Sequence, residues 1–159
     1  MHGLFIDNGP FRLDYSGDDI EVDLTSDTWF ENVNLLYLDQ PMGTGFSEYK
    51  NRKMTRIDKV DDINMENIAS SIVTFLVEFY SIHPEMQPQH LIIAGDSFAG
   101  TYIPYVASEI LEWNTDLDRV RIKLIGIALQ DAILDYQLQA VYVGNIPMAN
   151  GLLTDDLVP

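Results

Sequence analysis

A serine stands between an apolar run and a helix-like segment, in the sequence L-I-I-A-G-D-S-F-A-G of residues 91–100. A serine hydroxyl becomes a nucleophile when a base removes its proton, donors stabilise the oxyanion and the backbone presents the side chain. A tight turn from strand to helix achieves this presentation, and it requires small residues two positions before and two positions after the serine. Gly95 and Ala99 occupy those positions. The sequence therefore predicts that Ser97 is a nucleophile.

The same turn predicts the first oxyanion donor. It is the backbone N–H of the residue after the serine, Phe98, which the N-terminus of the following helix assists. The alternative interpretation is that Gly95, Asp96 and Ser97 form only a polar cap between a strand and a helix, which is a common use of these residue types.

The elements that must position Ser97 follow from hydrophobic periodicity. Alternating residues around an acidic turn predict an N-terminal hairpin, continuous apolar runs predict buried strands, and apolar residues at three- and four-residue spacing predict helices. Pro104 lies inside the second helical pattern and predicts a kink or a helix start at that residue. The expected elements are hairpin strands at 11–13 and 20–24, buried strands at 34–39, 91–94 and 124–129, helices at 60–80 and 99–113, and a loop with a short helix at 136–159. Alternating strands and helices are typical of a parallel α/β sheet.

Composition limits the classes of function. The 159 residues, 47% of them hydrophobic, suit one domain, and a net charge of -16 disfavours nucleic acid as a partner. The sequence has no cysteine, so it predicts neither a disulfide framework nor a cysteine-based metal site. It also shows no signal peptide and no apolar run of the roughly 18 residues that a membrane span needs. Oligomeric state is left open.

Two motifs resemble those of one family. Residues 95–104, G-D-S-F-A-G-T-Y-I-P, are similar to the G-E-S-Y-A-G-x-Y-x-P motif of the serine carboxypeptidases, and residues 39–47, D-Q-P-M-G-T-G-F-S, to their D-Q-P-x-G-T-G-F-S. Residues 3–11, G-L-F-I-D-N-G-P-F, resemble G-L-F-x-E-x-G-P-F. Within the family, the Kex1-like branch that processes hormones and pheromones is the nearest match. The resemblance implies one incomplete α/β-hydrolase domain over residues 1–159, with a mostly parallel sheet, helices on both faces and the N-terminal hairpin.

The resemblance also implies an activity. Family members release the C-terminal residue of a peptide through an acyl-enzyme on the serine, without metal or cofactor, at acidic pH in vacuoles, lysosomes or the secretory pathway. Their substrate carboxylate is held by acids that correspond to Asp96 and Asp7, both of which are glutamate in the family pattern. Two close carboxylates share a proton that can be donated to the substrate. By itself, Asp7 beside Asn8, Gly9 and Pro10 is more typical of a turn residue.

Other parts of the family pattern are not found in these residues. The N-G-G-P-G stretch that supplies a second oxyanion donor would precede Met1, and the triad aspartate and histidine would follow the third strand. His90 precedes the strand that leads to Ser97 and therefore lies at its opposite end, while His83 follows a helix and His2 is terminal.

We expect Asp39 to be structural. Asp131 replaces an asparagine of the family pattern near the site. Because the triad aspartate and histidine are not found in these residues, the chain alone is expected to be nearly inactive, as a fragment of a carboxypeptidase. The alternatives are a pseudoenzyme or peptide-binding relic, and an acyltransferase of the same fold.

Overall fold

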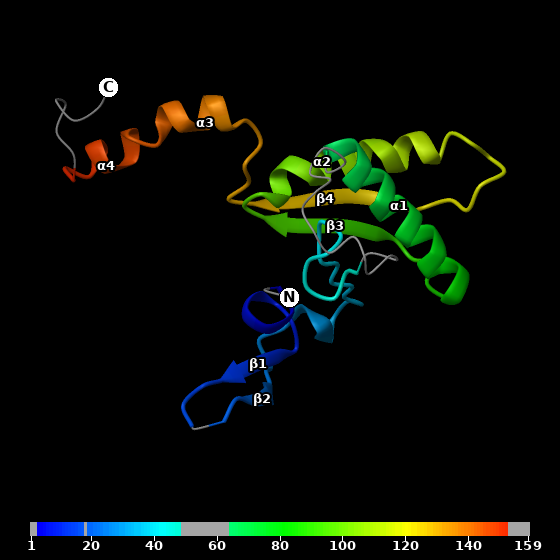
Figure 1. The fold of residues 1–159 in the computed structure, drawn as a ribbon, viewed down its shortest axis with the longest axis horizontal. Coiled ribbons are helices and arrows are strands. Elements are labelled where there is room, and N and C mark those ends of the chain that lie inside the picture. The colour runs from blue at the N-terminus through cyan, green and yellow to red at the C-terminus, as the bar shows by residue number, and fades with distance from the viewer. Residues whose placement is uncertain (1–2, 18, 49–63, 153–159) are drawn as a thin grey trace. The chain divides into compact units, whose positions relative to one another are not determined.

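A computed structural model describes residues 3–17, 19–48 and 64–152 (Figure 1). The chain divides into two compact units, Met1–Val60 and Asp61–Pro159. The predicted nucleophile lies in the second unit, and two of the three family-like motifs begin and end in the first.

The first unit contains the predicted N-terminal hairpin. A π-helical turn, η1 (Gly3–Asp7), precedes the antiparallel strands β1 (Phe11–Asp14) and β2 (Glu21–Leu24), and a 3₁₀ turn, η2 (Trp29–Glu31), follows them. The backbone N–H of Ser16 donates to Asp14 Oδ1 at 2.7 Å, and this hydrogen bond lowers the pKa of the Asp14 carboxyl. The acidic turn predicted from the sequence therefore closes the hairpin.

The buried strand predicted at residues 34–39 is not formed. This segment belongs to no strand in the structure, and Leu36 remains 49% exposed. An apolar run becomes a β-strand only when neighbouring strands satisfy its N–H and C=O groups, and within the described residues no strand pairs with this one. Sequence periodicity identified the apolar character of the segment but could not supply its partners.

The second unit has the predicted order of helix, strand, helix and strand. Helix α1 (Met65–Ile82) is capped by Asn64, whose side chain accepts from the N–H of Asn67. Helix α2 (Ala99–Trp113) connects the parallel strands β3 (Leu91–Asp96) and β4 (Leu124–Gln130). These elements form the βαβ crossover expected of an α/β fold. Two short helices follow, α3 (Tyr136–Tyr142) and α4 (Asn145–Ala149), where one was predicted.

The core of the second unit comes from the apolar stripes of α1 and α2. Helix α2 is continuous from Ala99, so the alternative of a helix start at Pro104 is wrong. Pro104 does not interrupt the apolar face of α2, because Ile103, Val106 and Ile110 keep helical spacing. The buried hydrophobic residues are Ile68, Ala69, Ile72, Val73, Leu76, Tyr80, Ile103, Val106, Ile110 and Ile122.

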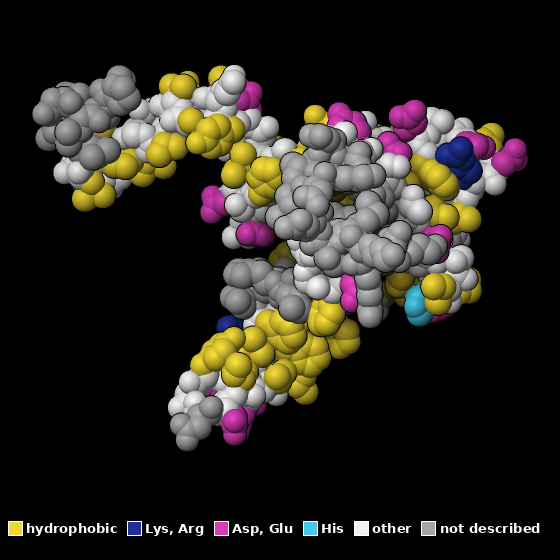
Figure 2. All heavy atoms as spheres, viewed as in Figure 1, with side chains coloured by type: hydrophobic (Ala, Val, Ile, Leu, Met, Phe, Trp, Pro, Cys, Tyr) yellow, Lys and Arg dark blue, Asp and Glu magenta, His cyan; other side chains and the backbone are white. Residues whose placement is uncertain are grey.

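Apolar residues also remain exposed in the second unit. Ile92, Ile125 and Ile127 on the strands are 58%, 60% and 43% exposed. Yellow side chains are visible along the α3 and α4 segment in Figure 2, where exposed residues include Leu138 and Val141. None of the described helices is both long and apolar enough to cross a membrane.

Candidate active site

Ser97 lies on a sharp turn between β3 and α2. Its φ angle is +53°, in the left-handed region that non-glycine residues rarely adopt, at an energetic cost of about 1–3 kcal/mol. Three hydrogen bonds hold this backbone. The N–H of Ser97 donates to the carbonyl of Gln130 (3.1 Å), and its own carbonyl accepts from the N–H groups of Gly100 (3.1 Å) and Ile133 (2.8 Å). The strained serine is therefore fixed by both its own helix and the turn after β4.

Small residues around the serine are required by contact distances. A Cβ atom added to Gly95 would lie 2.5 Å from the Cβ of Ala99, so neither position has room for a larger side chain in this conformation. The structure thus supplies the physical reason for the small residues on which the nucleophile prediction was based.

Gly100 allows the turn after β4 to approach the start of α2. A Cβ at this position would lie 2.5 Å from the Cβ of Ala132 and 2.9 Å from the backbone nitrogen of Ile133. The hydroxyl of Thr101 donates to the carbonyl of Ile133 at 2.8 Å, which ties the same two segments together. This close contact brings Ile133 within hydrogen-bonding distance of the Ser97 carbonyl.

The Gly100→Ala substitution will therefore destabilise the second unit. Alanine gains about 1 kcal/mol of helix propensity over glycine, but overpacking against backbone costs about 1–3 kcal/mol. We expect a net loss in the free energy of unfolding, measured by urea denaturation. Gly126→Ala in β4 is the matched control, because a Cβ there would meet no atom within 4 Å. Equal stability of the two variants would show that the approach of the turn to α2 is not needed.

The predicted oxyanion donor is available. Among the residues that the structure describes, none accepts a hydrogen bond from the N–H of Phe98, and Phe98 immediately precedes the first residue of α2. The helix N-terminus contributes partial positive charge at this position. The Ser97 hydroxyl likewise has no hydrogen-bond partner within the described ranges, and the residue is exposed. The arrangement presents a hydroxyl and an N–H at the same sheet edge.

Asp96 is the last residue of β3 and is exposed. Burial and, secondarily, the negative charge of Asp96 raise the pKa of Tyr102, whose ring lies edge-on to Phe98 with centroids 5.7 Å apart. The Asp96 carboxylate therefore lies close enough to Tyr102 to act on it electrostatically. Tyr102 was not identified from the sequence as a residue near the site. Its position four residues after Phe98, at the start of a predicted helix, could have indicated that the two rings are neighbours.

Asp7, the second predicted carboxylate-binding residue, is the last residue of η1 in the first unit. Its partnership with Asp96 remains a prediction. The next residue, Asn8, is a centre of hydrogen bonding. Its side-chain Oδ1 accepts from the Tyr37 hydroxyl (2.7 Å), and its carbonyl accepts from the Thr28 hydroxyl (2.8 Å) and the Trp29 N–H (3.2 Å). The backbone next to Asp7 is thus held in place.

The predicted structural role of Asp39 is confirmed. Its Oδ2 accepts from the N–H of Phe46 (2.9 Å), and its carbonyl accepts from the Ser47 hydroxyl (2.7 Å). Gly45 has a φ of +54°, and a Cβ there would collide with the Asp39 carboxylate. The D-Q-P-M-G-T-G-F-S segment is therefore a closed loop built around this aspartate.

The histidines of the second unit lie away from Ser97. His83 is the C-cap of α1, with Nδ1 3.4 Å from Glu85 Oε1 and its ring 4.8 Å from that of Phe79. His90 precedes β3 and so lies at the opposite end of that strand from Ser97, as predicted. His2 is outside the described residues. Asp131 follows β4 with a φ of +44°, next to the Gln130 carbonyl that Ser97 uses.

Comparison with known proteins assigns this arrangement to a family. The family model for serine carboxypeptidases matches residues 1–158. A serine carboxypeptidase-like protein of Oryza sativa is 32% identical over 151 residues, which are 95% of this chain and 33% of the relative. The pheromone-processing carboxypeptidase KEX1 of Saccharomyces cerevisiae is 36% identical over 115 residues, 72% of this chain and 15% of the relative.

A solved structure gives the same result. The crystal structure of Kex1Δp, a prohormone-processing carboxypeptidase from Saccharomyces cerevisiae, matches with a TM-score of 0.84 and 30% identity, over 98% of this chain and 32% of that chain. The chain thus spans a third or less of the length of these relatives. The match also confirms the predicted α/β-hydrolase architecture of a parallel sheet with an N-terminal antiparallel hairpin. The chain belongs to the serine carboxypeptidase family.

Proposed function

We propose that this chain carries the nucleophile of a serine-type carboxypeptidase that releases C-terminal residues from peptides or proteins. The observation that supports this most strongly is the left-handed φ of Ser97 between Gly95 and Ala99, at the point where β3 passes into α2. Such strain persists only where the surroundings hold it, and it concentrates at active sites. The hydrogen bonds from Gly100 and Ile133 to the Ser97 carbonyl provide that support.

In the proposed reaction, Ser97 Oγ attacks the carbonyl carbon of the last peptide bond. A base from outside the described residues takes the hydroxyl proton and passes it to the leaving amine, which departs as the released C-terminal residue. The N–H of Phe98 stabilises the oxyanion, and water then hydrolyses the acyl-enzyme.

Asp96 and Asp7 are proposed to hold the terminal carboxylate of the substrate. A proton shared between two carboxyl groups allows one of them to donate to a third carboxylate, and this predicts activity at acidic pH. Each side chain is one methylene shorter than the glutamate of the family pattern, which withdraws its carboxyl by about 1 to 1.5 Å. The acidic optimum agrees with the location that family membership suggests for the parent protein, in vacuoles, lysosomes or the secretory pathway.

A peptide-binding relic is the second candidate. It is favoured by the absence, within the described ranges, of any hydrogen-bond partner for the Ser97 hydroxyl. Such a protein would keep the carboxylate-binding acids without turnover.

Reaction with a fluorophosphonate probe separates the two candidates. We expect the 159-residue chain to show no reaction at Ser97, because none of the residues that the structure describes places a base beside its hydroxyl. To restore the reaction, we would build a chimera in which this chain replaces the matched 32% of Kex1Δp from Saccharomyces cerevisiae. We expect Ser97 of this chimera to react. Mass spectrometry of the labelled peptide identifies the serine that reacts.

Ser108→Ala is the matched control for this labelling, because Ser108 is an exposed serine on α2. The substitution should leave labelling of the chimera unchanged. Rapid labelling of the isolated chain at Ser97 would show that a base does act on this hydroxyl within the chain and would contradict the expectation. A folded chimera that fails to react would favour the relic.

A further inference from the structure

A pocket of about 480 Å³ lies in the second unit, where the end of α1, the turn after it and the segment before β4 meet. It is near the amino ends of the strands, since the N–H of Leu91 donates to the carbonyl of Lys123 in the same region. The length of β3, about 16 Å, separates this end from Ser97. The pocket is therefore distinct from the candidate active site. Its polar lining comes from Tyr80, Ser81, Gln87, Arg119 and Arg121, and its apolar lining from Pro84 and Val120.

The walls of the pocket are joined by hydrogen bonds. Gln87 Nε2 donates to the carbonyl of Arg121 (3.1 Å), and Lys123 Nζ donates to the carbonyl of Pro88 (3.0 Å). Tyr80 forms part of the core at 7% exposure, and burial raises the pKa of its hydroxyl. Tyr80 is also among the residues that line the pocket, and its hydroxyl is a hydrogen-bond donor.

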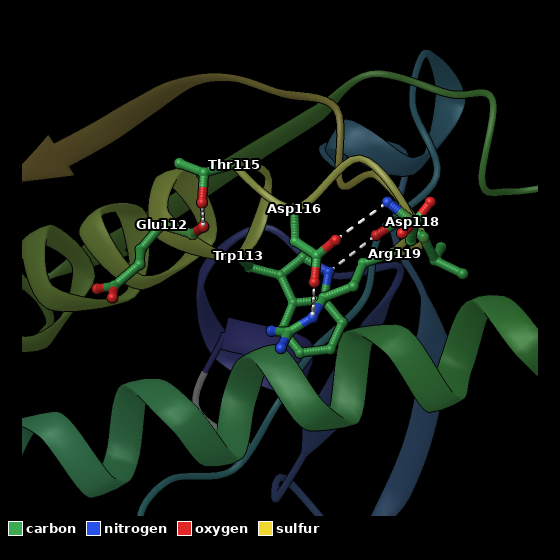
Figure 3. Close-up of polar contacts among 7 residues, drawn as sticks. Glu112, Trp113, Thr115, Asp116, Asp118 and Arg119 are labelled. Atoms are coloured by element: carbon green, nitrogen blue, oxygen red, sulfur yellow. Dashed lines mark hydrogen bonds and ion pairs between the residues drawn. The ribbon is translucent and has the colours of Figure 1, made fainter.

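Arg119 is held in one orientation by its own loop (Figure 3). Its Nε lies 2.9 Å from Asp116 Oδ2, and its guanidinium carbon lies 4.4 Å from the centre of the Trp113 ring. The indole N–H of Trp113 donates to the carbonyl of Val120 at 2.9 Å, and the N–H of Asp118 donates to Asp116 Oδ1 at 3.1 Å. A guanidinium has five N–H donors, and the ion pair with Asp116 uses the one on Nε. The other four N–H donors are not used by this ion pair.

The charge of the pocket is opposite to that of the chain. The protein has 25 acidic and only 9 basic residues, yet two arginines and no carboxylate are among the described residues that line this pocket. Asp116, which lies beside the pocket on the same loop, is paired with Arg119. Arginine guanidinium groups match the geometry of carboxylate and phosphate groups and form bidentate hydrogen bonds with them.

We propose that this pocket binds a small organic anion, a carboxylate or phosphate group carried on an apolar or aromatic body. Arg121 and the free donors of Arg119 hold the anionic group, and the Tyr80 hydroxyl adds a hydrogen bond. Pro84 and Val120 contact the apolar body. The volume falls within the range of about 300–1,000 Å³ that is usual for small-molecule sites.

Isothermal titration calorimetry of the 159-residue chain with phenyl phosphate tests this proposal. We expect saturable binding at one site and competition by benzoate and by inorganic phosphate. The stronger competitor shows whether the group is a carboxylate or a phosphate. Benzyl alcohol, which has the same aromatic body without the charge, should not bind. Equal binding of benzyl alcohol, or no saturable binding of phenyl phosphate to the folded chain, would overturn the proposal.

Variants connect the binding to the named residues. Arg121→Gln should weaken phenyl phosphate binding by about tenfold or more, because it removes a charge-assisted hydrogen bond. Tyr80→Phe should weaken it less, since only a neutral donor is lost. Arg12→Gln is the control, because Arg12 is an exposed arginine on β1 in the first unit and should leave the affinity unchanged. Equal affinities of the parent and the Arg121→Gln variant would exclude this site.

Discussion

Replacing Ser97 by alanine in the chimera with Kex1Δp will lower kcat/KM for a C-terminally cleaved peptide by about 10⁴-fold or more. Alanine removes the oxygen that forms the acyl-enzyme in the proposed reaction, while the proposed oxyanion donor and substrate-binding residues remain. The measurement is the rate of release of the C-terminal residue, with the folded fraction of each chimera checked by circular dichroism. The loss should appear in kcat, because the proposed carboxylate-binding residues, Asp96 and Asp7, are unchanged.

The expected effect is large because, in the proposed reaction, Ser97 itself bonds to the carbonyl carbon. Gly95, Ala99 and the turn after β4 serve to hold it in place. The control for activity is again Ser108→Ala, which should keep the parental rate. A Ser97→Ala chimera that cleaves as fast as its parent would show that the turn between β3 and α2 is not catalytic. It would leave the family assignment intact, since that assignment rests on the whole of residues 1–158.

Replacing Ile110 by alanine will have the largest effect on stability, a loss of about 2–5 kcal/mol in the free energy of unfolding. Ile110 is 0% exposed, on the face of α2 that also buries Ile103 and Val106. Truncation removes apolar contacts and leaves a cavity. Because domains are stable by only about 5–15 kcal/mol, this loss is a large part of the total.

The neighbouring residue Leu111 provides the matched control. It lies on the same helix but is 64% exposed, so Leu111→Ala should change stability by about 0.5 kcal/mol or less. Both variants can be compared by urea denaturation, with Trp113 fluorescence reporting on the second unit. Equal midpoints for the two variants would contradict the assignment of the α2 face that packs in the core.

Much of the second unit could be predicted because its determinants are local. The apolar stripe of α2 repeats every three or four residues, and its observed range, Ala99–Trp113, is the predicted one. The turn between β3 and α2 was also predictable, since the sterically critical residues Gly95 and Ala99 lie within two positions of Ser97. The strand predicted at residues 34–39 does not form, because a strand needs hydrogen-bonding partners from elsewhere in the chain, and local periodicity does not reveal them.

The sequence by itself determined the family, the nucleophile prediction and the order α1, β3, α2 and β4 in the second unit, because each depends on short local patterns of residues. Only the tertiary structure showed that Ser97 is held by Gln130 and Ile133, more than thirty residues away, and that Asp96 lies near Tyr102. Only the tertiary structure also showed the pocket lined by Arg119 and Arg121. It forms where the end of α1 and the turn after it meet the segment before β4. Contacts between distant segments depend on the path of the folded chain, and local periodicity contains no information about that path.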